Sequence, residues 1–358
     1  MKIGYLSADW SNAFPEDNGK KYQPGGAGWY RCHVPAAELA QHGYETAVCE
    51  QVAMSDRGLV LCDQDGNEHD DIDIIVMQRV MHEFAFNLVK IAQDGGQMVI
   101  NDIDDWYWGI HESNMASKQS DPNFNPEANR EHYRAAIEAS DLVTVSTPFL
   151  AEQISAWGCN VTVVPNAIDL DRWTPHEQAE TPMVGWVGST THRSNDLETV
   201  AKPVSEFVAD NGLFWYHGGW WEGFTHACEL VGIPASQSRT ALICSIYNYP
   251  NLFIPLDIGI VPLNMIPFNE AKSYIKGLEY AASGVPFVAQ ATGEYKRLAE
   301  SGIGRAVDGV EEWRDALDQL LDYDVRVAEA ASNLEAVREH DIKNLWGNWA
   351  EAYEKALR

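Results

Sequence analysis

The segment NMIPFNEAKSYIKGLEYAASGVPFVAQ, from Asn264 to Gln290, decides how the rest of the chain is interpreted. It predicts a loop, a helix from about Ser273 to Ser283, and a Gly-Val-Pro turn into a buried strand. Ser273 is the expected N-cap, because its hydroxyl can accept one of the unpaired amide protons of the first turn. Gly284 stands where a helix C-cap favours positive φ, and Pro286 prevents the helix from continuing.

A polar stripe runs along this predicted helix. Lys272, Lys276 and Glu279 are spaced i, i+4 and i+7, which places them on one face. Unpaired amides at a helix start attract phosphate, two lysines add positive charge, and a carboxylate two turns further can bind a ribose diol. This pattern is compatible with a nucleotide-sugar site, but the spacing alone favours the simpler alternative, a solvated face with an i, i+3 Lys–Glu pair. An apolar stripe suited to packing on a sheet lies beside it: Ile275, Leu278 and Ala282.

The sequence KSYIKGLEYAASGVPFVA resembles the donor-site segment of GT-B glycosyltransferases, in particular the retaining, family-4-like enzymes. Members of that family carry two glutamates on this helix with seven residues between them, followed by G-x-P and an apolar strand. Glu279 matches the second glutamate, which the resemblance implies binds the donor ribose. The first would fall on Ala271, and Glu270 is one position early. We interpret this departure as a variant of the site.

Composition limits the class of protein. A chain of 358 residues that is 45% hydrophobic predicts two domains or one large α/β domain with an ample core. The formal net charge of -28 excludes a general polyanion binder, because such proteins neutralise phosphates with lysine and arginine. A local basic cleft stays possible.

The six cysteines are scattered and form no C-x-x-C motif, so neither a zinc site nor a disulfide framework is predicted. We expect reduced thiols and a cytoplasmic protein. The N-terminal sequence predicts a strand without a signal-peptide pattern, and no apolar run reaches membrane-spanning length.

The beginning of the chain predicts a strand at Lys2–Ser7, a glycine-containing loop, and a helix from about Trp29 to Gln41. Strand, glycine loop and helix open a mononucleotide-binding unit, although a simple turn gives the same pattern. Arg31 is either a cation of the cleft or a solvated arginine. The glycines that would allow a ligand to approach the backbone are Gly25, Gly26 and Gly28.

Further elements continue the α/β pattern, and residues 55–71, which are polar and rich in aspartate, are interpreted as a surface excursion. The predicted strands are Thr46–Cys49, Ile72–Gln78, Met98–Asn101, Asp141–Ser146, Val161–Val164, Met183–Val187, Phe214–His217 and Asp257–Pro262. The predicted helices are Glu127–Ala139, one that starts at Pro148, Leu197–Ala209 and Asp341–Leu357.

Asp102 and Asp104 form a D-x-D motif just past a predicted strand. In GT-A enzymes such a pair holds a metal, but the resemblance here is to GT-B enzymes, so we expect a structural role and no metal. The carboxyl end of a strand is where α/β proteins bind ligands. Asp104, Asp105 and His111 are therefore candidates to orient an acceptor hydroxyl, with capping and loop roles as the alternative.

Two further segments resemble the family. PNAIDLDRW is similar to the P-N-G-x-D segment that closes the N-terminal domain, which places Asn166 near the hinge. GSTTHRSND resembles the opening of the donor domain, and implies that Arg193 binds the diphosphate. The domains that follow are residues 1–176 on the acceptor side, 177–340 on the nucleotide-sugar side, and a helix at 341–358 that crosses back.

The resemblance therefore implies an α/β protein of the GT-B class, with two Rossmann-like, doubly wound domains facing across a cleft. The expected donor-binding residues are Gly26, Gly188, Ser189, Thr190, Arg193, Lys272, Ser273, Tyr274, Lys276 and Glu279. The expected catalytic residues are Asp104, His111, Arg193 and Lys272.

The implied reaction transfers a sugar from a nucleotide-diphosphate sugar, such as a UDP-sugar, to an acceptor hydroxyl with retention of configuration. We expect no cofactor beyond the nucleotide sugar, no stable membrane insertion, and a monomer or homodimer. The acceptor stays open between a glycan, a small molecule and a hydroxylated DNA base. The alternative functions are an epimerase or hydrolase on the same fold, and a non-catalytic protein that binds nucleotide sugars.

Overall fold

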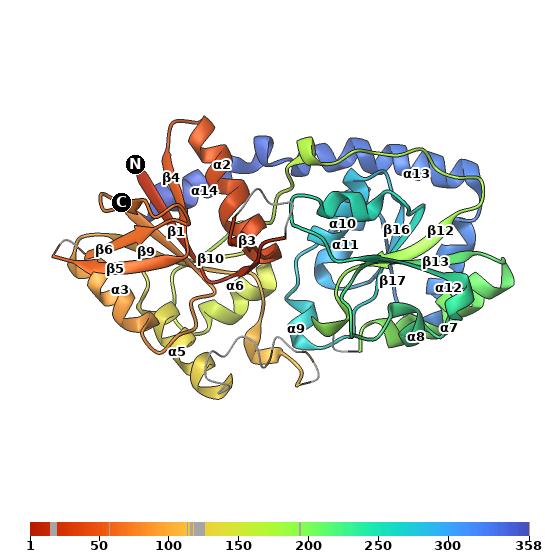
Figure 1. Cartoon of the computed structure of the whole chain (residues 1–358), viewed down its shortest axis with the longest axis horizontal. Coiled ribbons are helices and arrows are strands. Elements are labelled where there is room, and N and C mark those ends of the chain that lie inside the picture. Colours follow the sequence, from red (N-terminus) through yellow and green to blue (C-terminus); the bar gives the residue numbers. More distant parts are fainter. Residues whose placement is uncertain are drawn as a thin grey trace.

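The computed structural model describes residues 1–14, 20–56, 58–112, 114, 117, 126–192 and 195–357. Two lobes lie side by side, each built around its own parallel sheet (Figure 1). The strands are short apolar runs, as expected where helices cover both faces of a sheet.

The N-terminal sheet has the strand order β11-β10-β9-β8-β1-β4, and all of its pairings are parallel. Its strands are β1 (Lys2–Ser7), β4 (Glu45–Cys49), β8 (Ile74–Gln78), β9 (Met98–Ile103), β10 (Leu142–Val145) and β11 (Val161–Val163). The helical elements of this lobe are α1 (Gly26–Gly28), the π-helical turn η1 (Trp29–His33), α2 (Val34–Gln41), α3 (Ala85–Asp94), η2 (Tyr107–Gly109), α5 (Pro126–Ala139), α6 (Pro148–Ser155) and η3 (Leu170–Arg172).

Two small antiparallel sheets extend this lobe. One pairs β2 (Trp10–Asn12) with β3 (Tyr22–Pro24), and the other contains β5 (Gln51–Ser55), β6 (Gly58–Cys62) and β7 (Glu68–His69). Residues 55–71, interpreted from the sequence as a surface excursion, include β6 and β7. Leu59 and Leu61 of β6 are buried in the core, so β6 is anchored despite its polar neighbours.

The C-terminal sheet has the strand order β14-β13-β12-β15-β16-β17, the doubly wound order of a dinucleotide-binding fold. Its strands are β12 (Met183–Val187), β13 (Phe214–Trp220), β14 (Ser238–Leu242), β15 (Ile258–Val261), β16 (Phe287–Gln290) and β17 (Arg305–Val307). The helical elements are η4 (Thr190–His192), η5 (Leu197–Val200), α7 (Ala201–Asp210), α8 (Ala227–Val231), η6 (Ala235–Gln237), η7 (Tyr249–Phe253), α9 (Pro267–Glu270), α10 (Ile275–Ala282), α11 (Gly293–Glu300), α12 (Gly309–Gln319), α13 (Tyr323–Ala336), η8 (Val337–His340) and α14 (Ile342–Ala356).

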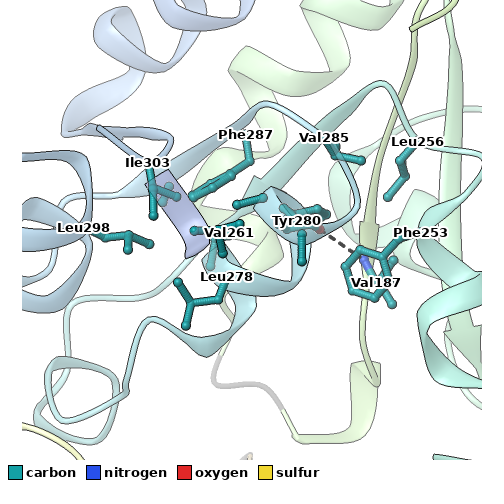
Figure 2. Packing of buried hydrophobic residues seen from close by; sticks show 14 of the residues in the cluster. Val187, Phe253, Leu256, Val261, Leu278, Tyr280, Val285, Phe287, Leu298 and Ile303 are labelled. Atoms are coloured by element: carbon teal, nitrogen blue, oxygen red, sulfur yellow. Dashed lines mark hydrogen bonds between the residues drawn. The ribbon is translucent and has the colours of Figure 1, made fainter. Parts of the chain in front are cut away.

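The helix α10 is shorter at its start than predicted. Its N-cap is Tyr274, which makes no capping bond, while the Ser273 hydroxyl accepts a bond from Asn166 of the other lobe at 2.8 Å. Its end is as predicted, because Gly284 adopts a φ of 73°. Figure 2 shows Tyr280 of α10 packed among Phe253 and Phe287, with its hydroxyl accepting a hydrogen bond from the Val187 amide.

The chain crosses between the lobes twice, and the two crossings lie together. Ile168 pairs with Asp341 in an isolated parallel bridge, and the Ile342 amide donates to the Ile168 carbonyl at 2.8 Å. Beyond this point α14 lies in the N-terminal lobe beside α2 (Figure 1), where Trp349 and Tyr353 are buried in its core. The domain limits at 176 and 340 stay predictions.

Candidate functional site

A cavity of about 450 Å³ lies between the lobes and is lined by residues of both. It opens where strands of the two sheets end, as expected for doubly wound sheets. Eight of the predicted site residues line it: Gly26, Asp104, Gly188, Ser189, Lys272, Ser273, Lys276 and Glu279.

Three of the other predicted residues lie outside the cavity lining. The Thr190 hydroxyl donates to the Thr225 carbonyl at 3.0 Å, the Tyr274 ring packs edge-on against His340, and His111 is exposed outside the cavity lining. Arg193 falls outside the residues that the structure describes.

Glu279 is almost fully enclosed, with 3% of its surface exposed. Its Oε1 accepts a 2.8 Å hydrogen bond from the Tyr30 hydroxyl, and its Oε2 accepts one of 3.1 Å from Tyr249 and pairs with Lys276 at 2.6 Å. Burial and the neighbouring carboxylate raise the pKa of both tyrosines well above its ordinary value, so both hydroxyls keep their protons and donate.

The two lysines that were expected on one face of a single helix do not both lie on that helix. Lys272 precedes α10, and its Nζ pairs with Asp105 of the N-terminal lobe at 3.3 Å while lying over the Phe268 ring. Lys276 is on α10 and contacts Tyr249 as well as Glu279. The cavity therefore has two cationic groups at its C-terminal wall.

The two aspartates of the D-x-D motif, Asp102 and Asp104, lie in different surroundings. Both Asp102 oxygens accept hydrogen bonds from Arg31, at 2.8 and 2.7 Å, and Thr144 donates a third bond to this carboxylate. Arg31 is fully buried and donates also to Asn166 and the Val164 carbonyl, so it is neither a free cleft cation nor solvated. Removing one partner of such a buried pair costs about 3–5 kcal/mol. We conclude that Asp102 has a structural role.

Asp104 lines the cavity from the N-terminal lobe, whereas Glu279 lines it from the C-terminal lobe. Burial, and next the neighbouring Asp105, raise the pKa of Asp104 to about 7, although Arg79 opposes the shift. Its Oδ1 is shielded from solvent and has no hydrogen-bond partner among the residues that the structure describes. A carboxyl group that titrates near neutral pH and has an unused oxygen is suited to bind a hydroxyl proton.

The glycines of the first glycine loop, Gly25, Gly26 and Gly28, differ in whether they lie against other protein atoms or leave free space. A Cβ on Gly25 would lie 2.4–2.5 Å from the Asp9 carboxylate, and one on Gly28 would lie 2.9 Å from the Asp9 carbonyl oxygen. A Cβ on Gly26 would meet nothing within 4 Å. Gly26 is therefore the glycine of this loop that leaves space for a ligand.

A hydrogen bond from His217 holds the loop that contains Gly188. Burial lowers the pKa of His217 to about 4, so its ring is neutral. Nδ1 accepts from the Ala227 amide at 3.4 Å, which makes Nε2 the donor to the Gly188 carbonyl at 3.0 Å. The Gly188 amide already donates to the Gly218 carbonyl, so Gly188 shapes the cavity while its amide is used within the protein.

Sequence reasoning missed three residues that shape the site: Tyr30, Tyr249 and His217. None belongs to a recognisable motif, and their partners are distant in sequence, as Tyr30 and Glu279 are separated by 249 positions. The one local signal was the aromatic pair that follows the first glycine loop, at Trp29 and Tyr30.

Comparison with known structures finds similar folds over the whole length of the chain. Sucrose-phosphate synthase from Thermosynechococcus elongatus aligns over 100% of this chain and 99% of its own, with a TM-score of 0.65 and 12% identity. The HepE protein of Anabaena, solved with UDP and glucose, aligns over 99% of this chain and 100% of its own, with a TM-score of 0.63 and 14% identity.

The chain has the GT-B fold. An alpha-glucosyltransferase (AGT) solved with UDP shares it, with a TM-score of 0.61, 13% identity and full coverage of both chains. The fold predicted from the donor-helix segment is thereby confirmed.

A curated relative is also a glycosyltransferase, as the resemblance predicted. The D-inositol 3-phosphate glycosyltransferase of Corynebacterium jeikeium (strain K411) is 28% identical in an alignment of 268 residues that covers 64% of this chain. The chain spans 60% of the length of that relative. No family model matches the chain. In the part that the structure describes, no helix combines the length and apolarity needed to cross a membrane.

Proposed function

We propose that the protein is a glycosyltransferase that moves a sugar from a nucleotide-diphosphate sugar, with UDP as the nucleotide, to an acceptor hydroxyl. The observation that carries this proposal is the cavity between the lobes. Lys272, Lys276 and Glu279 line it from one lobe and Asp104 from the other. Solved structures of the same fold with UDP bound, and the glycosyltransferase relative, support this proposal.

On the donor side, the diphosphate needs positive charge when it leaves. Lys272 and Lys276 supply it at the cavity wall, and Arg193 adds a third cation in the proposed site. Electrostatic stabilisation of the departing diphosphate is the largest contribution these residues can make, because negative charge develops on the leaving group. Glu279 binds the ribose hydroxyls, sharing its oxygens with Tyr30 and Tyr249.

On the acceptor side, Asp104 receives the hydroxyl proton or holds it in place through its unpaired oxygen. Retention of configuration rests on the resemblance of the α10 segment alone. The position of the first family glutamate is Ala271, which is fully buried against the N-terminal lobe, and its carbonyl accepts a bond from Thr147. In the proposed reaction no carboxylate acts from that position. The cytoplasmic location stays a prediction, as does the oligomeric state.

The test is a panel of UDP-sugars with the purified protein, with and without candidate acceptors. UDP release and the mass of the products are recorded for the wild type, for Lys272→Ala, and for Lys202→Ala as a surface control. We expect acceptor-dependent UDP release that Lys272→Ala alone reduces. Acceptor-independent release of free sugar would indicate a hydrolase, formation of an isomeric UDP-sugar an epimerase, and binding without turnover a non-catalytic protein.

A further inference from the structure

The first helical segment that lines the cavity begins at Gly26, and the carboxylate of Asp9 caps its start. The Gly28 amide donates to Asp9 Oδ2 at 2.9 Å, and the Gly25 amide donates to the Asp9 carbonyl at 2.7 Å. Exposed amides at such a position attract anions. Here Asp9 accepts the hydrogen bonds of these amides. A side chain at Gly25 or Gly28 would collide with the carboxylate or the backbone of Asp9.

The arginines beside this wall are also used within the protein. Arg79 donates to Asp9 Oδ1 at 2.8 Å, and Arg31 is paired with Asp102 in the core. Arg79 has a φ of 58°, a strained backbone for a residue other than glycine, which the ion pair with Asp9 helps to hold. Among the described residues that line the cavity from the N-terminal lobe, no cation is left to meet an anionic ligand.

The charged groups that this lobe does present to the cavity are acidic. Asp104 and Asp105 both line it, and Asp104 has the unpaired, shielded Oδ1 described above. The lysine that faces them, Lys272, is paired with Asp105 and belongs to the donor side. A phosphate at this wall would meet two carboxyl groups and no available cation among the described cavity-lining residues of this lobe, whereas a hydroxyl could donate to Asp104.

We propose that the acceptor is an uncharged polyol or sugar that carries no phosphate or carboxylate where it meets the N-terminal lobe. This inference rests on the proposed function and narrows its substrate class. It separates this protein from any glycosyltransferase whose acceptor is a sugar or polyol phosphate.

The test uses matched acceptors that differ by one phosphate: glucose with glucose 6-phosphate, and myo-inositol with inositol 3-phosphate. With the best UDP-sugar of the panel as donor, kcat/KM is measured for each from UDP release and product mass. We expect the free member of at least one pair to be used at least about tenfold better, a difference of about 1.4 kcal/mol. Equal or better use of the phosphorylated members, or transfer to no free member, would overturn the inference.

Asp9→Asn tests the cause. It removes the charge and one of the two acceptor oxygens that bind the Gly28 amide and Arg79, so the preference for the free acceptor should fall at least about threefold while UDP affinity stays close to the wild type. An unchanged preference in a folded variant overturns the role of Asp9. UDP binding is measured by calorimetry without acceptor. If the proposed function is wrong, the protein should neither bind UDP nor turn over any UDP-sugar, and this result differs from each outcome above.

Discussion

The Tyr30 hydroxyl donates a 2.8 Å hydrogen bond to Glu279 across the cleft. Tyr30 belongs to the π-helical turn η1 of the N-terminal lobe and Glu279 to α10 of the C-terminal lobe, so this bond ties the lobes together at the proposed ribose site. Any diol bound by Glu279 has to share or replace this contact. Donor binding and the relative placement of the lobes are therefore coupled through one carboxylate.

Glu279→Gln should weaken donor binding. A hydrogen bond from a diol to a carboxylate is worth about 1.5–3 kcal/mol, and the amide keeps the shape but loses the charge and one acceptor. We expect the donor KM to rise by roughly ten- to a hundredfold. The measurement is steady-state kinetics with the preferred UDP-sugar and with a donor that lacks the ribose 2′-hydroxyl. If the variant distinguishes these donors as well as the wild type does, Glu279 does not hold the ribose.

Tyr30→Phe is the matched control for Glu279, because it removes one partner of the carboxylate and leaves the charge. Loss of a buried hydrogen bond should lower the free energy of unfolding by about 1–3 kcal/mol. UDP affinity should not fall, since a ribose hydroxyl can take the vacated position on Oε1. Denaturant unfolding and calorimetry measure the two effects, and a loss of UDP affinity as large as in Glu279→Gln would assign Tyr30 to the donor site itself.

Lys272→Ala and Arg193→Ala should each lower donor affinity or turnover at least about tenfold, equivalent to about 1.4 kcal/mol or more. The physical reason is the loss of a cation beside the diphosphate, and neither change should lower the melting temperature much. Lys202→Ala is the control, because Lys202 lies on the surface of α7 with 69% of its side chain exposed. Wild-type affinity and turnover in both variants would show that the diphosphate binds elsewhere.

Asp104 should make stability depend on pH. Burial and Asp105 raise its pKa from 3.8 to about 7, so between these values the native state binds more protons than the unfolded chain. The free energy of unfolding therefore falls as pH rises from about 4 to 7, by at most about 4 kcal/mol from this group. Asp104→Asn cannot ionise and should gain stability relative to the wild type over that range.

Denaturant unfolding at pH 5 and pH 8 measures this difference, with Asp315→Asn as a control at an exposed position. The same pH dependence in the wild type and in Asp104→Asn would refute the raised pKa. In kinetics, kcat/KM should increase as Asp104 ionises near pH 7, because the ionised carboxylate is the form that accepts a hydroxyl proton.

Activity should survive treatment with EDTA. Both oxygens of Asp102 are committed to Arg31, and no cluster of metal-ligating side chains occurs among the residues that the structure describes. The measurement is UDP release before and after chelation. Complete loss that added Mg²⁺ or Mn²⁺ restores would show that a metal bridges the diphosphate, and that the D-x-D motif is functional after all.

Much of the fold was predictable because its signals are local. The strand Met183–Val187 was predicted residue for residue, and Gly284 ends α10 as expected because positive φ is a property of one position. Local signals also misled. Ser273 has the residue type of an N-cap, yet its hydroxyl bonds to Asn166, and an interlobe partner of this kind cannot be inferred from neighbours in sequence.

The sequence by itself therefore determined the two α/β units, the donor-helix segment and the class of enzyme it resembles, because periodicity, turns and motifs are carried by adjacent residues. Tertiary structure alone decided which groups of the cavity are available. Arg31 and Asp102 neutralise each other, Asp9 caps the first cavity-lining helix, and Tyr30 reaches Glu279 from the other lobe. Whether a charged or polar side chain can act on a ligand depends on the partner that folding places beside it, and these partners come from distant parts of the chain.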